Sequence, residues 1–79
     1  MSPTVFRSGG FRFYFFSREA PRMHVHVQRA NGEAKFWLEP QIELAQHYGL
    51  SQRQLNTARR LIGEHEDEIR AAWQAHFGN

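Results

Sequence analysis

The stretch that decides the fold is residues 24–38, which read HVHVQRANGEAKFWL. Residues 23–28 alternate Met or Val with His or Gln, as a strand with one buried face does. Asn31-Gly32 follows, a dipeptide typical of tight hairpin turns because both residues tolerate positive φ. Residues 33–38 then alternate Glu, Lys and Trp with Ala, Phe and Leu. The stretch therefore predicts an antiparallel hairpin with strands at about 23–28 and 33–38.

Upstream of this hairpin, Gly9-Gly10 separates two more apolar runs and predicts another tight turn. The runs predict strands at about 4–7 and 11–17, the second of them rich in aromatic residues. Downstream, Pro40 ends the fourth strand, because proline cannot donate a ladder hydrogen bond. We therefore expect a four-stranded antiparallel sheet in the N-terminal half of the chain.

The C-terminal half carries helical patterns. Residues 41–48 predict a short helix that Gly49 ends with a left-handed cap. Ser51 and Gln54 fit a capping box, which opens a helix. Apolar residues then recur at spacings of three and four over 52–77, one stripe of a long amphipathic helix. The expected fold class is therefore α+β, a single domain over residues 1–79 with the sheet packed by a short and a long helix.

The long helix is too long for the sheet that it should cover. Unbroken over 52–77 it would measure about 39 Å, whereas a globule of this size is only ~30 Å across. Either Gly63 interrupts it, or its C-terminal end projects and packs on another chain. We prefer the second interpretation, which makes the end of the helix the contact with a protein partner or a second copy, through Ile69, Trp73 and Phe77.

Composition excludes several classes of protein. With 79 residues there is no room for separate cofactor and substrate domains. The absence of cysteine excludes disulfides and thiolate metal sites and favours a cytoplasmic protein. No apolar run approaches the ~20 residues of a membrane span, and the start of the chain lacks a signal-peptide pattern, so we expect no membrane association.

The net charge of +2 conceals an asymmetry between the two halves. Residues 1–38 hold six basic and two acidic side chains, a balance of +4, and residues 39–79 hold four basic and six acidic ones, a balance of −2. If the protein meets a polyanion, its first half is the side to meet it.

Strand alternation divides the sheet into two faces. One face carries the core residues, Phe11, Phe13 and Phe15 among them. The other face carries Arg12, Tyr14, Phe16, His24, His26, Gln28, Lys35 and Trp37. Single-stranded nucleic acid suits such a face, because bases stack on rings while cations follow phosphates. The candidate nucleic-acid-binding residues are Arg12, Tyr14, Phe16, Arg22, Lys35 and Trp37. The alternative is that the helix at 41–48 covers this face and that its aromatic residues are core.

His24 and His26 are the sharpest chemical feature of the sequence. Next-but-one residues of a strand lie about 6.6–6.8 Å apart on one face, so two imidazoles could serve as base and acid in metal-independent RNA cleavage. Arg12, Arg22 or Lys35 would then stabilise the charge on phosphorus. A metal site would need a third ligand from Glu33, Glu19 or His47, and none lies nearby in sequence, so no metal or cofactor is expected. The alternative is a pair of half-exposed strand histidines with local hydrogen bonds.

Taken together, these segments resemble a family of small bacterial proteins of unknown function. The pieces that carry the resemblance are Pro3-Thr4-Val5-Phe6-Arg7, the aromatic strand 11–17, His24-Val25-His26-Val27 and Ala34-Lys35-Phe36-Trp37-Leu38. Relatives usually have Pro-Pro where this chain has Arg22-Met23. The resemblance implies a member of a toxin–antitoxin-like gene pair, with a tight protein partner and RNA or translation as the affected process.

Two hypotheses of function follow. The first, which we prefer, is a component of a toxin–antitoxin-like module that binds a partner protein and RNA. The second is a small ribonuclease with His24 and His26 as acid and base, so whether the protein is an enzyme stays open at this stage.

Overall fold

A computed structural model describes residues 4–16 and 22–78 of the chain. Within these residues, five strands precede two helices. The strands are β1 (Thr4–Ser8), β2 (Phe11–Tyr14), β3 (His24–Arg29), β4 (Gly32–Trp37) and β5 (Glu43–Tyr48), and the helices are α1 (Gln52–Glu64) and α2 (Glu66–Phe77). The α+β class and the antiparallel sheet are confirmed, with one strand more than the sequence predicts. Residue 17 of the second predicted strand and Glu19 lie outside the described residues.

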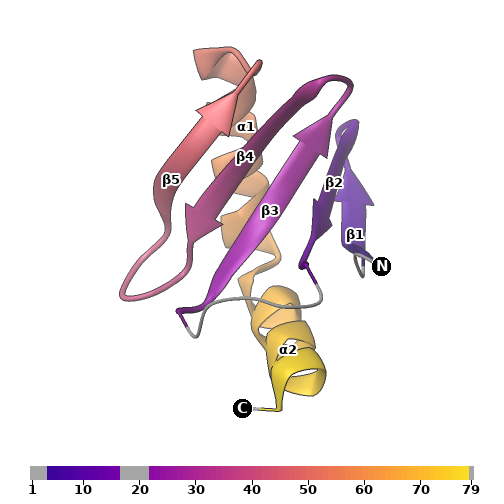
Figure 1. Ribbon diagram of the computed structural model, residues 1–79, viewed down its shortest axis with the longest axis vertical. Helices are drawn as coiled ribbons and strands as arrows, with labels where there is room; N and C mark the ends of the chain where they lie inside the picture. Colours follow the sequence, from indigo (N-terminus) through magenta and orange to yellow (C-terminus); the bar gives the residue numbers. More distant parts are fainter. Residues whose placement is uncertain (1–3, 17–21, 79) are drawn as a thin grey trace.

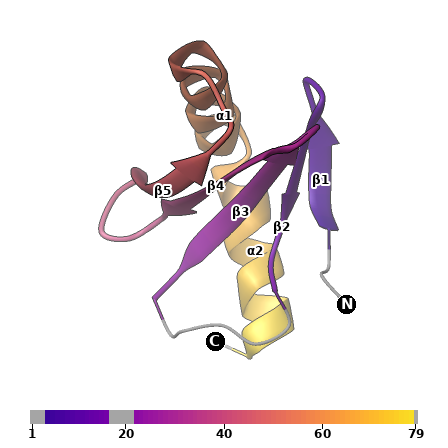
Figure 2. The same ribbon diagram turned by 45° about the horizontal axis from the view of Figure 1, so that its top comes forward.

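The strands form one sheet in the order β1-β2-β3-β4-β5, and each is antiparallel to the next. Both helices lie on the same side of this sheet, as Figure 1 shows with the sheet in front and Figure 2 shows from a tilted view. The side of the sheet turned away from the helices is called the outer face below. The side that faces them contributes Phe13, Val25 and Phe36 to the core, each at most 1% exposed.

The two tight turns form for different local reasons. Gly9 and Gly10 both have positive φ, 59° and 84°, as the predicted two-residue hairpin loop requires. In the second hairpin Arg29 pairs with Gly32, so the loop residues are Ala30 and Asn31. This is one residue earlier than Asn31-Gly32 predicts, and Ala30 takes the positive φ of 52°.

The predicted helix at 41–48 is wrong, because this segment is strand β5 at the edge of the sheet. Its Glu, Leu, Ala and Gln residues favour a helix intrinsically, but that preference is weak and an isolated helix of eight residues is marginal in water. Pairing with β4 instead satisfies backbone groups along a whole strand, and all six side chains of β5 stay exposed. With no helix at 41–48, the proposed cover of the outer face does not exist.

The predicted unbroken helix is wrong as well. The chain leaves helical geometry at His65, where φ is −113° and ψ is 19°, and not at Gly63. The largest extent of the molecule is 33 Å, shorter than the 39 Å or so that one straight helix would need. Beyond the break, α2 extends past the ends of the strands, and its Ile69 and Trp73 complete the core.

Helix α1 begins as the sequence predicts. The Ser51 hydroxyl accepts a hydrogen bond from the Gln54 backbone N–H at 3.1 Å, and the Gln54 side-chain oxygen accepts one from the Ser51 N–H at 2.8 Å. This capping box directs a buried stripe of four residues toward the sheet, namely Leu55, Ala58, Leu61 and Ile62. Across the described ranges, no helix is long and apolar enough to span a membrane.

Candidate nucleic-acid interface

The strand register arranges the outer face in rows that run across the sheet. Arg7, Arg12, Gln28, Glu33 and Tyr48 form the row nearest the two tight turns. The next row consists of Thr4, Tyr14, His26, Lys35 and Gln46, and the last consists of His24, Trp37 and Glu43. The register therefore puts the predicted cations and rings of β2, β3 and β4 on one face, opposite the helices.

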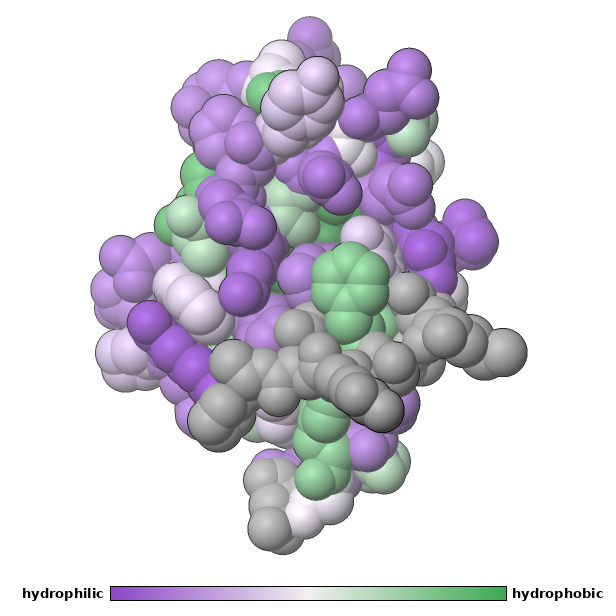
Figure 3. Space-filling model, viewed as in Figure 1, coloured by the Kyte–Doolittle hydropathy of each residue, from purple (hydrophilic) through white to green (hydrophobic). Residues whose placement is uncertain are grey.

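The six candidate nucleic-acid-binding residues differ in how far their side chains are exposed. Arg22 and Phe16 are exposed, and Arg12, His26, Lys35 and Trp37 are half-buried. Tyr14 is buried, because the Arg12 guanidinium lies 4.3 Å from its ring centroid and the rings of Phe16 and His26 lie 5.5 and 5.4 Å away. Tyr14 therefore supports its neighbours rather than offering a ring to a ligand. Figure 3 shows that the upper part of this face is mostly hydrophilic.

His24 lies on the predicted side of the sheet, but it is fully buried. Its Nδ1 donates a hydrogen bond to the Arg22 carbonyl oxygen at 2.7 Å, and its ring packs edge-on against Trp37 at 5.6 Å and Trp73 at 5.2 Å. The expectation of two outward-pointing imidazoles is wrong for this residue. Only His26, 5.1 Å away between ring centroids, is accessible in part.

Trp37 is the ring that cations surround. Arg22 lies 4.1 Å and Lys35 lies 4.5 Å from its ring centroid. The Arg22 Nε also donates a hydrogen bond to the Glu39 carbonyl oxygen at 3.1 Å, which holds this arginine at the lower end of the sheet. A nucleotide is bound by a ring on which its base stacks and by a cation that contacts its phosphate. Two cations beside a half-buried indole supply both.

The fifth strand adds residues to the outer face that sequence reasoning missed. Tyr48 is 72% exposed and Gln46 lies opposite Lys35. Together with His26 and Lys35 they line a hollow of about 200 Å³ in the face. A helical interpretation of 41–48 hides these residues. Strand alternation would not have found them either, because the register shifts between Lys35 and Phe36 and puts Leu44 and Gln46 on opposite faces.

The charge of the outer face is positive. Among residues 4–16 and 22–78, Arg7, Arg12, Arg22 and Lys35 supply four positive charges to this face and Glu33 and Glu43 supply two negative ones, a balance of +2. The sequence does not assign Arg7 to the outer face, because it does not give the pairing of the edge strand. The register now places it directly across from Arg12.

The three predicted interface residues of the C-terminal helix lie elsewhere than predicted. Ile69 and Trp73 are buried in the core, at 0% and 4% exposure, and Phe77 packs against the same core from the end of α2. The ring centroid of Trp73 lies 5.3 Å from that of Phe15 and 4.2 Å from that of Phe77. A partner would therefore meet at most the rim of this cluster, not Ile69 or Trp73.

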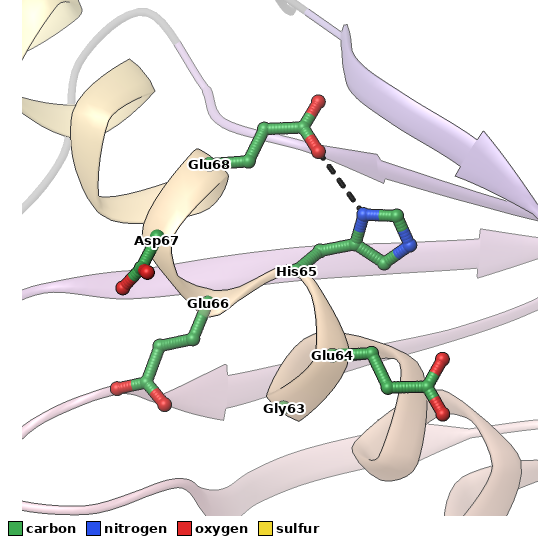
Figure 4. Close-up of a pocket in the computed structure, with 6 residues that line it drawn as sticks. All are labelled: Gly63, Glu64, His65, Glu66, Asp67 and Glu68. Carbon is green, nitrogen blue, oxygen red and sulfur yellow. Dashed lines mark hydrogen bonds and ion pairs between the residues drawn. The ribbon is translucent and has the colours of Figure 1, made fainter.

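The junction of the two helices forms a second polar hollow, lined by residues 63–68 (Figure 4). His65 stacks on Phe6 with ring centroids 4.1 Å apart, and its Nδ1 lies 3.0 Å from a carboxylate oxygen of Glu68. The other carboxylates point in different directions in Figure 4. Within residues 4–16 and 22–78, no group of three or more His, Cys, Asp or Glu side chains is placed to hold a metal ion. His65 therefore packs the junction of the two helices against β1.

Comparison with known families adds one result to this geometry. The profile of the family described as "Domain of unknown function (DUF4160)" matches residues 10–74. The chain belongs to the DUF4160 family. The match begins in the turn between β1 and β2 and ends in α2, so the rows formed by β2 to β5 all lie inside the DUF4160 domain. No curated protein and no solved structure matches the chain.

Proposed function

We propose that this DUF4160 protein is a single-stranded nucleic-acid-binding protein, with RNA as the ligand, and that the outer face of its sheet is the binding surface. One observation carries the proposal. The register sets Lys35 and the half-buried His26 between two rings, Trp37 and Tyr48, on a face that neither helix covers. Trp37 and Tyr48 belong to rows four residues apart on neighbouring strands, which separates them by roughly 14 Å.

The interaction energies favour replacing a cation–π contact within the protein by the stacking of a nucleic-acid base on the same ring. A cation–π contact at an exposed site is worth about 0.5–1 kcal/mol, whereas a base stacked on an aromatic side chain is worth about 1–3 kcal/mol. A base can therefore replace Arg22 or Lys35 beside Trp37. The displaced cation then pairs with a phosphate of the same strand, so the contact is exchanged and not lost.

The family resemblance implies both a protein partner and RNA, and the two would bind to different surfaces of the molecule. A toxin–antitoxin-like role in the cytoplasm would require a protein partner as well as RNA. Because Ile69 and Trp73 are core residues, that partner would contact other surfaces, such as the exposed strand β5 or the rim of α2 around Phe77. RNA on the outer face leaves the helices accessible to such a partner.

A binding titration tests the proposal. Fluorescence anisotropy would measure the Kd of a short single-stranded RNA and of the matching duplex at several salt concentrations. We expect tighter binding of the single strand and a slope of about −2 in log K against log salt, as three neutralised phosphates give. Equal affinity for the duplex, or no binding at low salt, would contradict the proposal.

The most useful variant is Tyr48→Ala, because this exposed ring contributes little to folding. Loss of one stacking ring predicts a Kd about five- to hundredfold weaker. Leu44→Ala is its matched control, since Leu44 lies opposite Phe36 and so on the helix side of the same strand. Lys35→Gln should weaken binding and reduce the salt slope by about 0.7.

Ribonuclease activity remains the competing hypothesis, and the burial of His24 argues against it. A fully buried imidazole cannot contact a phosphodiester in this conformation. Incubation of labelled RNA with the wild type, His26→Ala and His24→Asn separates the two ideas. Cleavage that His26→Ala abolishes would replace the binding proposal with an enzymatic one, whereas intact RNA throughout supports binding alone.

A further inference from the structure

Three arginines surround one hollow at the corner of the outer face beside the tight turns. Arg7, Arg12 and Arg29 line it together with Thr4, Gln28 and the backbone of residues 10 and 30, around a volume of about 290 Å³. Within the part of the chain that the structure describes, no carboxylate lines this hollow. The one acid in the same row of described residues, Glu33, lies opposite Gln28 on the next strand and lines the neighbouring hollow instead.

The arginine pair at this corner is electrostatically unfavourable by itself. Arg7 and Arg12 are direct cross-strand partners. Side chains in such positions begin about 4.5–5.5 Å apart at Cβ, and like charges directly opposite destabilise a sheet. Among the described residues, neither Arg7 nor Arg29 takes part in an ion pair. An anion in the hollow would convert this repulsion into attraction.

Two of the arginines are held in position. The Arg12 Nε donates a hydrogen bond to the Thr4 hydroxyl at 2.7 Å, and one of its terminal nitrogens lies 3.5 Å from the Gln28 side-chain oxygen. The Arg29 guanidinium lies 5.5 Å from the Phe11 ring centroid, over the turn. A Cβ at Gly10 would lie 3.0 Å from the Arg29 Nε, so the glycine leaves room for this guanidinium.

The count of charges selects the ligand. A phosphodiester inside a strand carries one negative charge, whereas a phosphomonoester carries about −1.5 to −2 at pH 7 and three acceptor oxygens. Guanidinium groups bind such oxygens through paired, charge-assisted hydrogen bonds. The hollow is lined by three arginines, one each from β1, β2 and the end of β3. Their positive charge is more than a phosphodiester needs and suits the higher negative charge of a phosphomonoester.

We propose that the hollow formed by Arg7, Arg12 and Arg29 binds a terminal phosphate of a nucleic-acid strand. The inference rests on the proposed function and adds to it that the ligand has a phosphorylated end. The hollow and Trp37 lie at opposite ends of the same face, roughly 16 Å apart by strand geometry, so a strand anchored at its end crosses Lys35 before it reaches Trp37.

The experiment compares three short RNAs of the same sequence with a central dye, one with a 5′-phosphate, one with a 3′-phosphate and one with neither. We expect one of the two phosphorylated forms to bind about tenfold more tightly than the unphosphorylated form. The double variant Arg7→Gln/Arg29→Gln should abolish that preference, and both phosphorylated forms should then bind no more tightly than the unphosphorylated RNA, whose own affinity falls only by the general loss of two positive charges. Arg59→Gln/Arg60→Gln on α1 is the matched control, because it removes the same charge from the side away from the outer face.

Each outcome separates the inference from the proposed function. Equal affinities for all three RNAs would overturn the terminal-phosphate site and leave RNA binding intact. A third outcome is that no RNA binds, that a nucleoside monophosphate does bind, and that the Arg7→Gln/Arg29→Gln protein no longer binds this nucleotide. The hollow would then be a phosphomonoester site for a free nucleotide, and the proposed RNA-binding function would be wrong. A preference for the phosphorylated end that survives in the double variant would also overturn the site. Far-UV circular dichroism checks that both double variants are folded.

Discussion

The imidazole of His24 packs against the indole of Trp73, with ring centroids 5.2 Å apart and ring planes at 66°. His24 is the first residue of β3 and Trp73 lies in α2, so this contact joins the end of the sheet to the last helix. Below the end of the strands, α2 extends past the sheet, as Figure 1 shows. Alternation assigns His24 to the outer face correctly, but at the end of a strand the two faces are no longer separated by the sheet.

We expect His24→Ala to lower the free energy of unfolding by about 2–4 kcal/mol. The substitution removes a fully buried ring between two tryptophans and leaves the Arg22 carbonyl oxygen without its hydrogen-bond donor. His24→Asn should lose less, because its side-chain amide can donate from nearly the same position as Nδ1. Urea unfolding measures all three proteins.

The neighbouring histidine is the control for this series. His26 is half-buried on the same face, so His26→Ala should cost less than about 1 kcal/mol. Equal losses for His24→Ala and His26→Ala would mean that His24 is not a core residue.

Trp73→Ala should destabilise the fold by about 3–5 kcal/mol without changing the oligomeric state. The indole is 4% exposed and contacts Phe15 and Phe77, so its removal opens a large cavity. Because total stability is only about 0.05–0.15 kcal/mol per residue, this loss can unfold the protein, and Trp73→Phe provides a milder variant. Thermal unfolding and sedimentation velocity measure the two properties separately. A variant with an unchanged unfolding midpoint and weakened self-association would make Trp73 an interface residue instead.

Arg70 connects α2 to the segment between β4 and β5, and its replacement by Met should cost about 1–2 kcal/mol. The guanidinium donates to Glu66 at 2.9 Å, to Glu39 at 3.0 Å and to the Leu38 carbonyl oxygen at 3.0 Å. Hydrogen bonds to Glu39 and then Glu66 raise the pKa of Arg70 above its ordinary value. A raised pKa of a cation gives stability that is present below that ordinary value and lost only above it, so titration of Arg70 itself produces no change between pH 5 and 9.

Two comparisons make the Arg70 prediction specific. Arg70→Lys should recover only part of the loss, since one ammonium group cannot reach Glu39, Glu66 and Leu38 together. Arg60→Met removes an arginine whose ion pair with Glu64 is more than half exposed on both sides, so it should cost less than about 0.5 kcal/mol. Chemical denaturation that gives Arg60→Met the larger loss would contradict this account.

The first four strands could be predicted from the sequence because each carries its own local signal. The alternation of 23–28 and 33–38 and the Gly9-Gly10 turn do not depend on distant residues. Strand β5 could not be predicted in this way, since its helix-forming residues become a strand only when β4 offers an unpaired edge. The break at His65 could not be predicted either, because the apolar stripe continues from α1 into α2.

The candidate site follows the same division. Alternation alone is enough to place Arg12, His26, Lys35 and Trp37 on one face. It does not give the pairing register, so it could not show that Arg7 lies opposite Arg12 or that Tyr48 extends the face. Nor does it give burial. His24 is not accessible because it packs against Trp37 and Trp73, which lie far along the chain, and Tyr14 is buried by its neighbours on the same face.

Two glycines in different surroundings give opposite predictions for replacement by alanine. Gly63 lies inside α1, where a Cβ would meet only the end of the Ile42 side chain at 3.9 Å. Since glycine in a helix interior costs roughly 0.5–1 kcal/mol relative to alanine, Gly63→Ala should stabilise the protein by about that amount. In contrast, a Cβ at Gly32 would lie 2.6 Å from the backbone oxygen of Gly49, which cannot move aside without displacing the start of α1, so Gly32→Ala should cost more than about 2 kcal/mol. Thermal unfolding of both variants measures the difference, and a destabilising Gly63→Ala would mean that the helix is interrupted there and not at His65.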